Sequence, residues 1–174
     1  MLKKLKFFFI IFLFSYCTNS FSENNILFID IEFIYLNSNA GKIVNEKVKS
    51  ETKKINDEFT TYQKKIKDER SKLINQKNIL SQDELRKKSV ELEKQIKEYN
   101  KIISTKKKEL ATYKNTTKIE FLNKLSKIVQ EYASNNSIEM IIKKDNILIG
   151  KNNLDATNDV LDLFNKNIKS IESK

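Results

Sequence analysis

LINQKNILSQDEL, residues 73–85, is the stretch of sequence that decides the fold. The hydroxyl of Ser81 can accept a hydrogen bond from the amide of Glu84, while the Glu84 carboxylate can reach back to the Ser81 amide. This reciprocal capping box predicts that a new helix begins here. The apolar periodicity of the preceding segment continues to Leu80, which leaves almost no residues for a loop. The sequence therefore predicts a sharp turn near residues 78–81 between two helices.

Apolar residues repeat at heptad positions on both sides of this turn, with Thr52, Glu69, Gln76 and Lys106 interrupting the pattern. The first run comprises Val48, Ile55, Phe59, Tyr62, Ile66, Leu73 and Leu80, and the second comprises Leu85, Leu92, Ile96, Tyr99, Ile103, Leu110 and Tyr113. Such a narrow stripe suits one partner helix. If the chain folds back, three pairs should meet: Tyr62 with Tyr99, Ile66 with Ile96, and Phe59 with Ile103. Each limb of about forty residues is about 60 Å long, so the hairpin must project.

The segments that flank the hairpin predict a small platform of strands and short helices. Residues 25–31 (NILFIDI) are apolar on both faces, as in a buried strand, and Asp30 can cap a short helix after it. Residues 138–142 and 147–149 are apolar runs separated by a polar turn, which predicts a β-hairpin. Thr157 can cap a final amphipathic helix. The expected fold class is therefore α+β.

The strand platform predicts an oligomer. Three short strands from one chain would leave exposed edges and one apolar face in water. Association of several copies would close these edges and bury that face. The candidate oligomerisation residues are Ile26, Phe28, Ile29, Ile138, Met140, Ile142, Ile147 and Ile149.

The first 22 residues are typical of an export signal. A basic start is followed by the apolar run Phe7–Phe14 and by small residues at Ser20 and Ser22, so we expect cleavage after Ser22. The apolar run is shorter than the ~20 residues that a membrane-spanning helix needs. Two alternatives stay open: a retained anchor, and lipidation of Cys17, although such a cysteine normally follows a small residue and here follows Tyr16.

The composition argues against an enzyme and against a metal protein. The chain has no His and a single Cys, which removes the commonest general base and the usual zinc ligands. Residues 39–42 (NAGK) lack the first Gly of a phosphate-binding loop. We therefore expect no catalytic residues, no metal and no cofactor. Residues 40–135 carry 24 Lys and Arg against 14 Asp and Glu, which would attract nucleic acid, but an export signal argues against that partner.

The order of these segments resembles the Skp/OmpH-like periplasmic chaperone family. The residues that carry the resemblance are 26–36, the Ala40-Gly41-Lys42 triplet, 138–142, 146–150 and 154–161. The resemblance implies a β-barrel-like oligomerisation body with a long protruding antiparallel helical hairpin, a coiled-coil tentacle. The expected domains are a signal peptide (1–22), a body (23–39 and 136–174) and an arm (40–135). It also implies a homotrimer in the periplasm.

The resemblance further implies ATP-independent holding of unfolded outer-membrane proteins in the cavity between the arms, and contact with lipopolysaccharide or an anionic membrane surface. The candidate client-binding residues of the distal arm are Lys64, Lys65, Lys67, Lys72, Lys77, Arg86, Lys87, Lys88 and Lys94. For any single Lys, a solvated coiled-coil exterior is the simpler explanation. The alternative function is an envelope coiled-coil structural or adaptor protein without chaperone activity.

Overall fold

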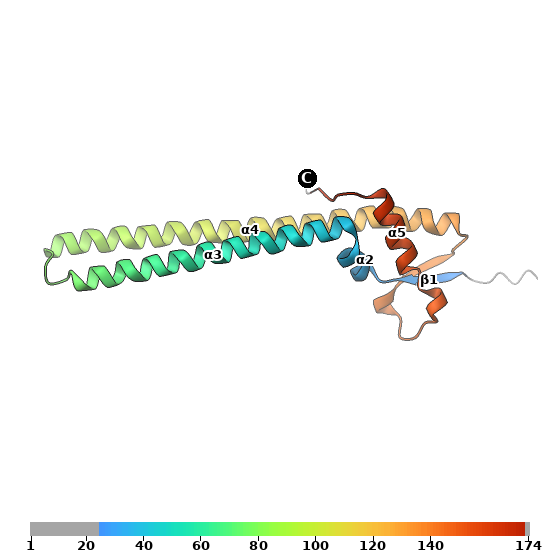
Figure 1. The fold of residues 1–174 in the computed structure, drawn as a ribbon, viewed down its shortest axis with the longest axis horizontal. Coiled ribbons are helices and arrows are strands. Elements are labelled where there is room, and N and C mark those ends of the chain that lie inside the picture. The colour runs from blue at the N-terminus through green and yellow to red at the C-terminus, as the bar shows by residue number, and fades with distance from the viewer. Residues whose placement is uncertain (1–24, 173–174) are drawn as a thin grey trace, which may run out of the picture.

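The computed structural model describes residues 25–172 of the 174-residue chain. In chain order the elements are β1 (Ile26–Ile29), α2 (Ile31–Asn37), α3 (Asn39–Asn75), α4 (Gln82–Asn135), β2 (Met140–Lys143), the 3-10 helices η1 (Lys144–Asn146) and η2 (Asn152–Leu154), and α5 (Thr157–Asn167). Helices α3 and α4 lie side by side and antiparallel, and form an arm that projects far from a small body (Figure 1). The expected export signal lies outside the described residues.

The arm is held together by the predicted heptads. Ile55 and Ile66 of α3 and Leu92 and Ile103 of α4 are buried along its length, although the helices have solvent on every other side. Tyr62 lies against Tyr99, as the spacing predicted. The arm is therefore a two-helix coiled coil whose apolar side chains are shared between its own two helices.

The tip of the arm is a tight turn. The capping box is confirmed, because the hydroxyl of Ser81 accepts from the Glu84 amide while the Glu84 carboxylate accepts from the Ser81 amide. Helix α3 ends at Asn75, five residues before the end of the predicted apolar run. The chain bends back there because the amides of Ile79 and Leu80 both donate to the carbonyl of Gln76.

The strands of the body differ from the prediction. Strands β1 and β2 pair in parallel, with Ile26 opposite Met140 and Phe28 opposite Ile142. The predicted β-hairpin is wrong, since residues 147–149 form no strand in the described chain and follow the 3-10 turn η1 instead. The second edge of β1 is occupied by residues after η2, where the Ala156 amide donates to the Phe28 carbonyl.

The core of the body lies where α2, α5 and the body end of α4 meet. Phe121 packs against both Tyr35 and Phe164, with ring centroids 4.9 Å apart in each pair. The apolar face of α4 widens at its body end through Val129, which packs on the core, whereas Leu122 is exposed. The aromatic core fixes α4 in the body, and Ala40 and Val44 at the start of α3 belong to the same core, so both helices of the arm are rooted in the body.

Two caps and one glycine fix how α2, α3 and α5 begin. Asp30 caps α2 as predicted, with its carboxylate accepting from the Phe33 amide. The predicted cap of α5 by Thr157 is wrong, because Asp155 accepts from the Thr157 amide and the buried Thr157 hydroxyl instead accepts from the Asp30 amide. Gly41 allows α2 and α3 to approach closely, since a Cβ atom there would overlap the carbonyl oxygen of Tyr35.

Candidate interaction surfaces on the arm and the body

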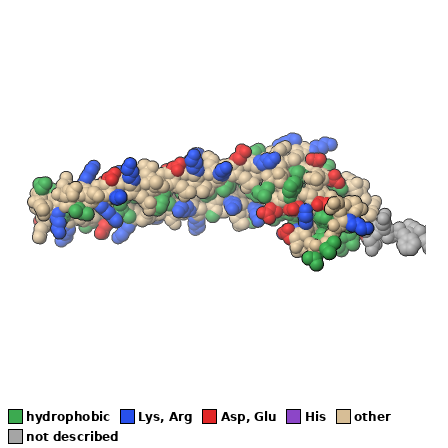
Figure 2. All heavy atoms as spheres, turned by 60° about the horizontal axis from the view of Figure 1, so that its bottom comes forward, with side chains coloured by type: hydrophobic (Ala, Val, Ile, Leu, Met, Phe, Trp, Pro, Cys, Tyr) green, Lys and Arg blue, Asp and Glu red, His purple; other side chains and the backbone are tan. Residues whose placement is uncertain are grey.

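Basic side chains are spread along the arm on the face that Figure 2 shows. All nine candidate client-binding residues are exposed: Lys64, Lys65, Lys67 and Lys72 on α3, Lys77 in the tip turn, and Arg86, Lys87, Lys88 and Lys94 on α4. The structure does not bring the nine into one cluster. Arg86, Lys87 and Lys88 share a shallow depression with Val90 near the tip. Lys65 reaches Glu69 at 3.9 Å, and Lys88 donates to the side chain of Gln76 at 3.4 Å.

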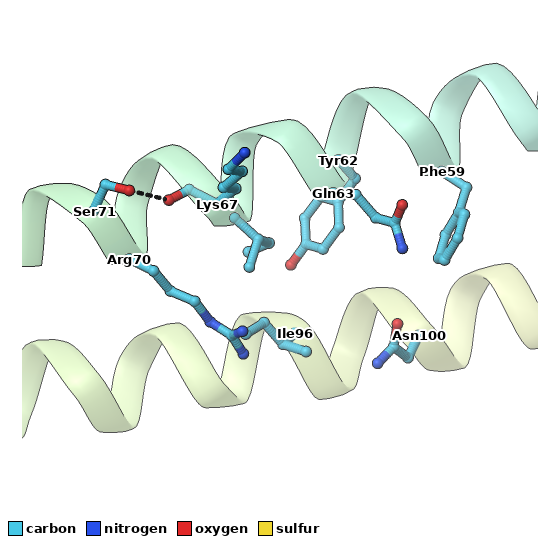
Figure 3. Close-up of a pocket in the computed structure, with 9 residues that line it drawn as sticks. Phe59, Tyr62, Gln63, Lys67, Arg70, Ser71, Ile96 and Asn100 are labelled. Atoms are coloured by element: carbon cyan, nitrogen blue, oxygen red, sulfur yellow. Dashed lines mark hydrogen bonds between the residues drawn. The ribbon is translucent and has the colours of Figure 1, made fainter.

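A groove of about 480 Å³ opens between the two helices in the middle of the arm (Figure 3). Its apolar lining includes Phe59, Ile66 and Ile96, and its polar lining includes Lys67 and Arg70. Arg70 is not among the candidates from the sequence. It follows Glu69 directly and flanks the heptad seam, and this position could have marked it as a residue that lines the groove between the helices.

The stack of Tyr62 on Tyr99 borders this groove. The ring centroids are 3.4 Å apart and the ring planes differ by 16°. Both hydroxyl oxygens are buried and have no hydrogen-bond partner within the described residues. Burial raises the pKa of both hydroxyls. The two tyrosines therefore contribute to the seam through their rings. Their hydroxyl groups are buried without forming the hydrogen bonds that would offset the loss of water.

One ion pair crosses the arm where the apolar seam is interrupted. The ammonium of Lys106 lies 2.5 Å from the carboxylate of Glu58, and this hydrogen bond raises the pKa of Lys106. Both side chains are close to half exposed. The next residue, Lys107, places its ammonium 5.4 Å from the ring centroid of Phe59. At this height of the arm an ion pair replaces the apolar contact between the two helices. An exposed pair of this kind stabilises the arm only weakly.

Apolar side chains also reach the surface at the distal end of the arm. Ile79, in the tip turn, is 82% exposed, and Ile74 and Val90 are largely exposed as well. The heptad pattern does not identify them, because Ile74 and Val90 lie off the apolar stripe and Ile79 lies in the turn. The tip therefore combines single apolar side chains with the cations around them.

The candidate oligomerisation residues divide into buried and exposed groups. Phe28 and Ile29 are buried within their own chain, and their assignment to an interface stays a prediction. Phe28 packs its ring against Gly150, and Ile29 is part of the core of the body. Both faces of β1 are covered from within the chain, which the apolar pattern alone could not reveal. The half-buried candidates are Ile138, Ile142 and Ile147, and the exposed candidates are Ile26, Met140 and Ile149.

The segment after η1 is the most exposed apolar part of the body. Leu148 is 96% exposed and Ile149 is 89% exposed. Leu148 was missed because it stood between two residues assigned to a strand. The outer edge of β2 is also open, since β1 is its only strand partner within the described residues. The body thus carries an unpaired strand edge and a protruding apolar loop.

Lys144 ties this loop to the two helix caps. Its ammonium lies 3.4 Å from the carboxylate of Asp155 and 3.8 Å from that of Asp30. Burial raises the pKa of Asp155, but hydrogen bonds from Thr157 and Lys144 outweigh this effect and leave the pKa below its ordinary value. The carboxylate of Asp155 is therefore ionised in the folded chain at neutral pH, as the capping arrangement requires.

Two kinds of site are absent from the described part of the chain. No group of three or more Asp, Glu, Cys or His side chains there is placed to hold a metal ion. Within residues 25–172, no helix has both the length and the apolar character needed to cross a membrane.

Comparison with known proteins places the chain in a family. The sequence profile of the family described as "Outer membrane protein (OmpH-like)" matches residues 25–164. No curated protein matches the chain. The crystal structure of a candidate outer membrane chaperone (OmpH-like) from Caulobacter crescentus CB15 superposes with a TM-score of 0.78 at 16% identity, covering 87% of this chain and 89% of that one. That structure shares the fold, and the profile spans most of the sequence, so this chain belongs to the OmpH-like outer membrane protein family.

Proposed function

We propose that this protein is an ATP-independent holding chaperone of the periplasm, which captures unfolded outer-membrane proteins between its arms. The observation that carries the proposal is the projecting arm, whose exposed surface is rich in cations and whose apolar seam is closed on itself. Membership of the OmpH-like family and the fold shared with a candidate outer membrane chaperone support it.

The arm suits the physics of holding rather than folding. A holding protein must bind many sequences reversibly, which favours many weak contacts over one deep pocket. Exposed cations attract a chain with carboxylates over a range of about 8 Å at physiological ionic strength. Single exposed apolar side chains such as Ile79 and Val90 can add brief contacts without a fixed shape. The surface thus supplies capture without requiring an energy source.

A homotrimer is part of this proposal. The open edge of β2 and the exposed Leu148 and Ile149 would leave a monomer with a strand edge and an apolar loop in water. Pairing these surfaces between copies would remove both liabilities. Because each arm leaves its body in one direction, a symmetric ring of copies would surround a common space with arms.

The proposed location follows from the first 22 residues and the family. The basic and apolar start followed by small residues is typical of an export signal. Cleavage after Ser22 would release a chain that begins just before β1. Mass spectrometry of the protein purified from the cell envelope should give Glu23 as the first residue, and a lipid-modified Cys17 would contradict this processing.

The function can be tested by diluting urea from an unfolded outer-membrane barrel protein in the presence of the purified mature chain. We expect light scattering by the aggregating client to fall as the chaperone is added, without ATP. Scattering that rises equally with and without this protein would reject the holding function and favour a structural or adaptor role in the envelope. Static light scattering on the chaperone alone would give the number of copies.

A further inference from the structure

Four lysines recur at every seventh residue along α4. Lys87, Lys94, Lys101 and Lys108 are all exposed, and together they are called the lysine row. Only Lys87 and Lys94 were among the candidates from the sequence. With a rise of 1.5 Å per residue, the row extends about 32 Å along the arm, with about 10 Å between neighbours.

The lysine row lies on the side of α4 that faces away from α3. Each member precedes a seam residue by nine positions, which is about two and a half helical turns. The seam residues concerned are Ile96, Ile103, Leu110 and Thr117, of which Ile103 and Thr117 are buried and the other two half-buried. The row therefore projects directly outward from the arm, where it contributes nothing to the packing of the two helices.

Solvent exposure alone does not explain the row. The equivalent outward positions of α3, at the same heptad spacing, are Ile43, Ser50, Asp57, Lys64 and Ser71. Those positions occupy the same place in the heptad, yet their side chains are, in order, apolar, neutral, acidic, basic and neutral. Four lysines in succession on α4 are thus a property of this face and not of the coiled-coil exterior in general.

The charge of the row is also not neutralised within the chain. Glu84, Glu91 and Glu98 precede row members by three residues, a spacing at which ion pairs form on helices. In residues 25–172 none of these glutamates lies within ion-pair distance of a row lysine. Glu84 is engaged by Ser81, and Glu91 accepts from Gln95. All four ammonium groups are therefore available to an external partner.

We infer that the lysine row is the track along which acidic, extended segments of an unfolded client lie. This inference rests on the proposed holding function and specifies the part of the arm that performs the capture. An unfolded chain in the polyproline II conformation advances about 3.1 Å per residue and repeats its side-chain direction every three residues, so the interval between two row lysines matches about three residues of client. A carboxylate at every third position could then meet successive lysines over about ten residues.

The spacing also sets how binding depends on salt. Neighbouring ammonium groups are about one Debye length apart at 0.15 M ionic strength, so each contact acts nearly independently. The contacts are individually weak because they are exposed. Affinity should therefore come from their number, and it should fall steeply as salt is added.

The test compares two variants of equal net charge in the full mature protein. In the row variant, Lys87, Lys94, Lys101 and Lys108 become Gln, and in the control variant, Lys97, Lys107, Lys114 and Lys118 become Gln. All eight residues are exposed and lie on α4. Circular dichroism should show equal helix content for both variants, since no substituted side chain is buried. The probe is a labelled 12-residue peptide with Glu at every third position, followed by fluorescence anisotropy at low and physiological salt.

We expect the row variant to bind the peptide about tenfold more weakly than the parent protein and the control variant to stay within about twofold, as four weak exposed contacts would give. A matched peptide with Gln in place of Glu should bind neither protein measurably. Equal losses in the two variants, or equal binding of the Gln peptide, would overturn the inference. So would unchanged peptide binding together with lost binding to phosphatidylglycerol vesicles, which would assign the row to lipid.

The same variants distinguish failure of this inference from failure of the proposed function. If the parent protein suppresses aggregation of an unfolded barrel protein and the two variants suppress it equally, the lysine row is not the track although holding stands. If the parent protein does not suppress aggregation at all, the holding function itself fails. If the row variant alone suppresses aggregation less well than the parent protein, the result supports both the lysine row as the track and the holding function.

Discussion

The phenol rings of Tyr62 and Tyr99 lie face to face across the arm, 3.4 Å apart between centroids. The pair fixes the alignment of α3 against α4 at one level, because residues one turn away on either helix could not stack in the same way. Neither hydroxyl is satisfied within the described residues. The stack therefore stabilises the arm through its rings and loses some of that stability through its polar ends.

Replacement of both tyrosines by Phe should raise the stability of the arm by up to about 1 kcal/mol, because two buried hydroxyls without partners are removed while the rings remain. Thermal unfolding followed by circular dichroism checks this. Tyr132→Phe is the control, since the Tyr132 hydroxyl donates to Asp159 and its loss should lower stability. A drop in stability for the double variant would show that the hydroxyls have partners in solution.

Lys106→Leu should stabilise the coiled coil by about 1 kcal/mol, since Leu would extend the apolar seam and an exposed ion pair contributes less than a buried apolar side chain. Glu58 is about half exposed and would return to water. Urea unfolding at two salt concentrations is the measurement. The gain should be larger at high salt, where the original ion pair is screened, and no gain at either concentration would refute this account.

Thr157→Val should lower stability by roughly 1–3 kcal/mol, because the Asp30 amide would lose its acceptor inside the body. Valine has nearly the shape of threonine, so packing is kept. Thr60→Val, at an exposed position of α3, serves as the control and should change stability little. Chemical unfolding of both variants compares them directly, and equal effects would rule out a special role for the Thr157 hydroxyl.

The depressed pKa of Asp155 predicts a loss of stability in acid. Because the folded pKa lies below the unfolded value of about 4, the ionised carboxylate stabilises the fold above that value, and this contribution disappears as the pH falls through the folded pKa. Asp155→Asn should therefore be less stable than the parent at pH 7 and differ less from it near pH 3. Urea midpoints across this pH range provide the measurement, and a difference that stays constant with pH would contradict it.

Leu148→Lys combined with Ile149→Lys should weaken self-association, because charges would replace the most exposed apolar side chains of the body. Sedimentation velocity should show smaller species for this variant at the same concentration. Ile79→Lys is the control, as Ile79 is similarly exposed but lies at the tip of the arm. Equal sedimentation of all three proteins would remove the body loop from the interface.

The arm could be predicted in detail because its determinants are local. The capping box of Ser81 and Glu84 lies within four residues, and the heptads on either side repeat a simple spacing. Pairing across the turn then follows by counting, which is why Tyr62 and Tyr99 were matched correctly. All nine candidate client-binding residues are exposed. The heptad spacing of the apolar residues gave no reason to distinguish Lys87 and Lys94, which belong to the lysine row, from the other seven.

The body was harder to predict because distant segments decide it. The run at residues 147–149 is as apolar as a strand, yet the chain after β2 turns into the 3-10 helix η1 instead of a hairpin turn, and the chain near Ala156 takes the second edge of β1. Thr157 is a residue type that often caps helices. Its hydroxyl instead accepts a hydrogen bond from the Asp30 amide, 127 residues earlier in the chain. Neither competition is visible in the local sequence.

Helix α4 runs for 54 residues without interruption, from the capping box at the tip to a point beyond the aromatic core. At 1.5 Å per residue it is about 80 Å long, and the buried side chains of Phe121, Leu125 and Ile128 hold one end of it in the body. Helix α3 enters the same core through Ala40 and Val44 near its start and supports α4 along the arm. A cargo pulling sideways on the free end would therefore exert its torque on this one core, so that mechanical load and core packing are coupled through the two helices of the arm.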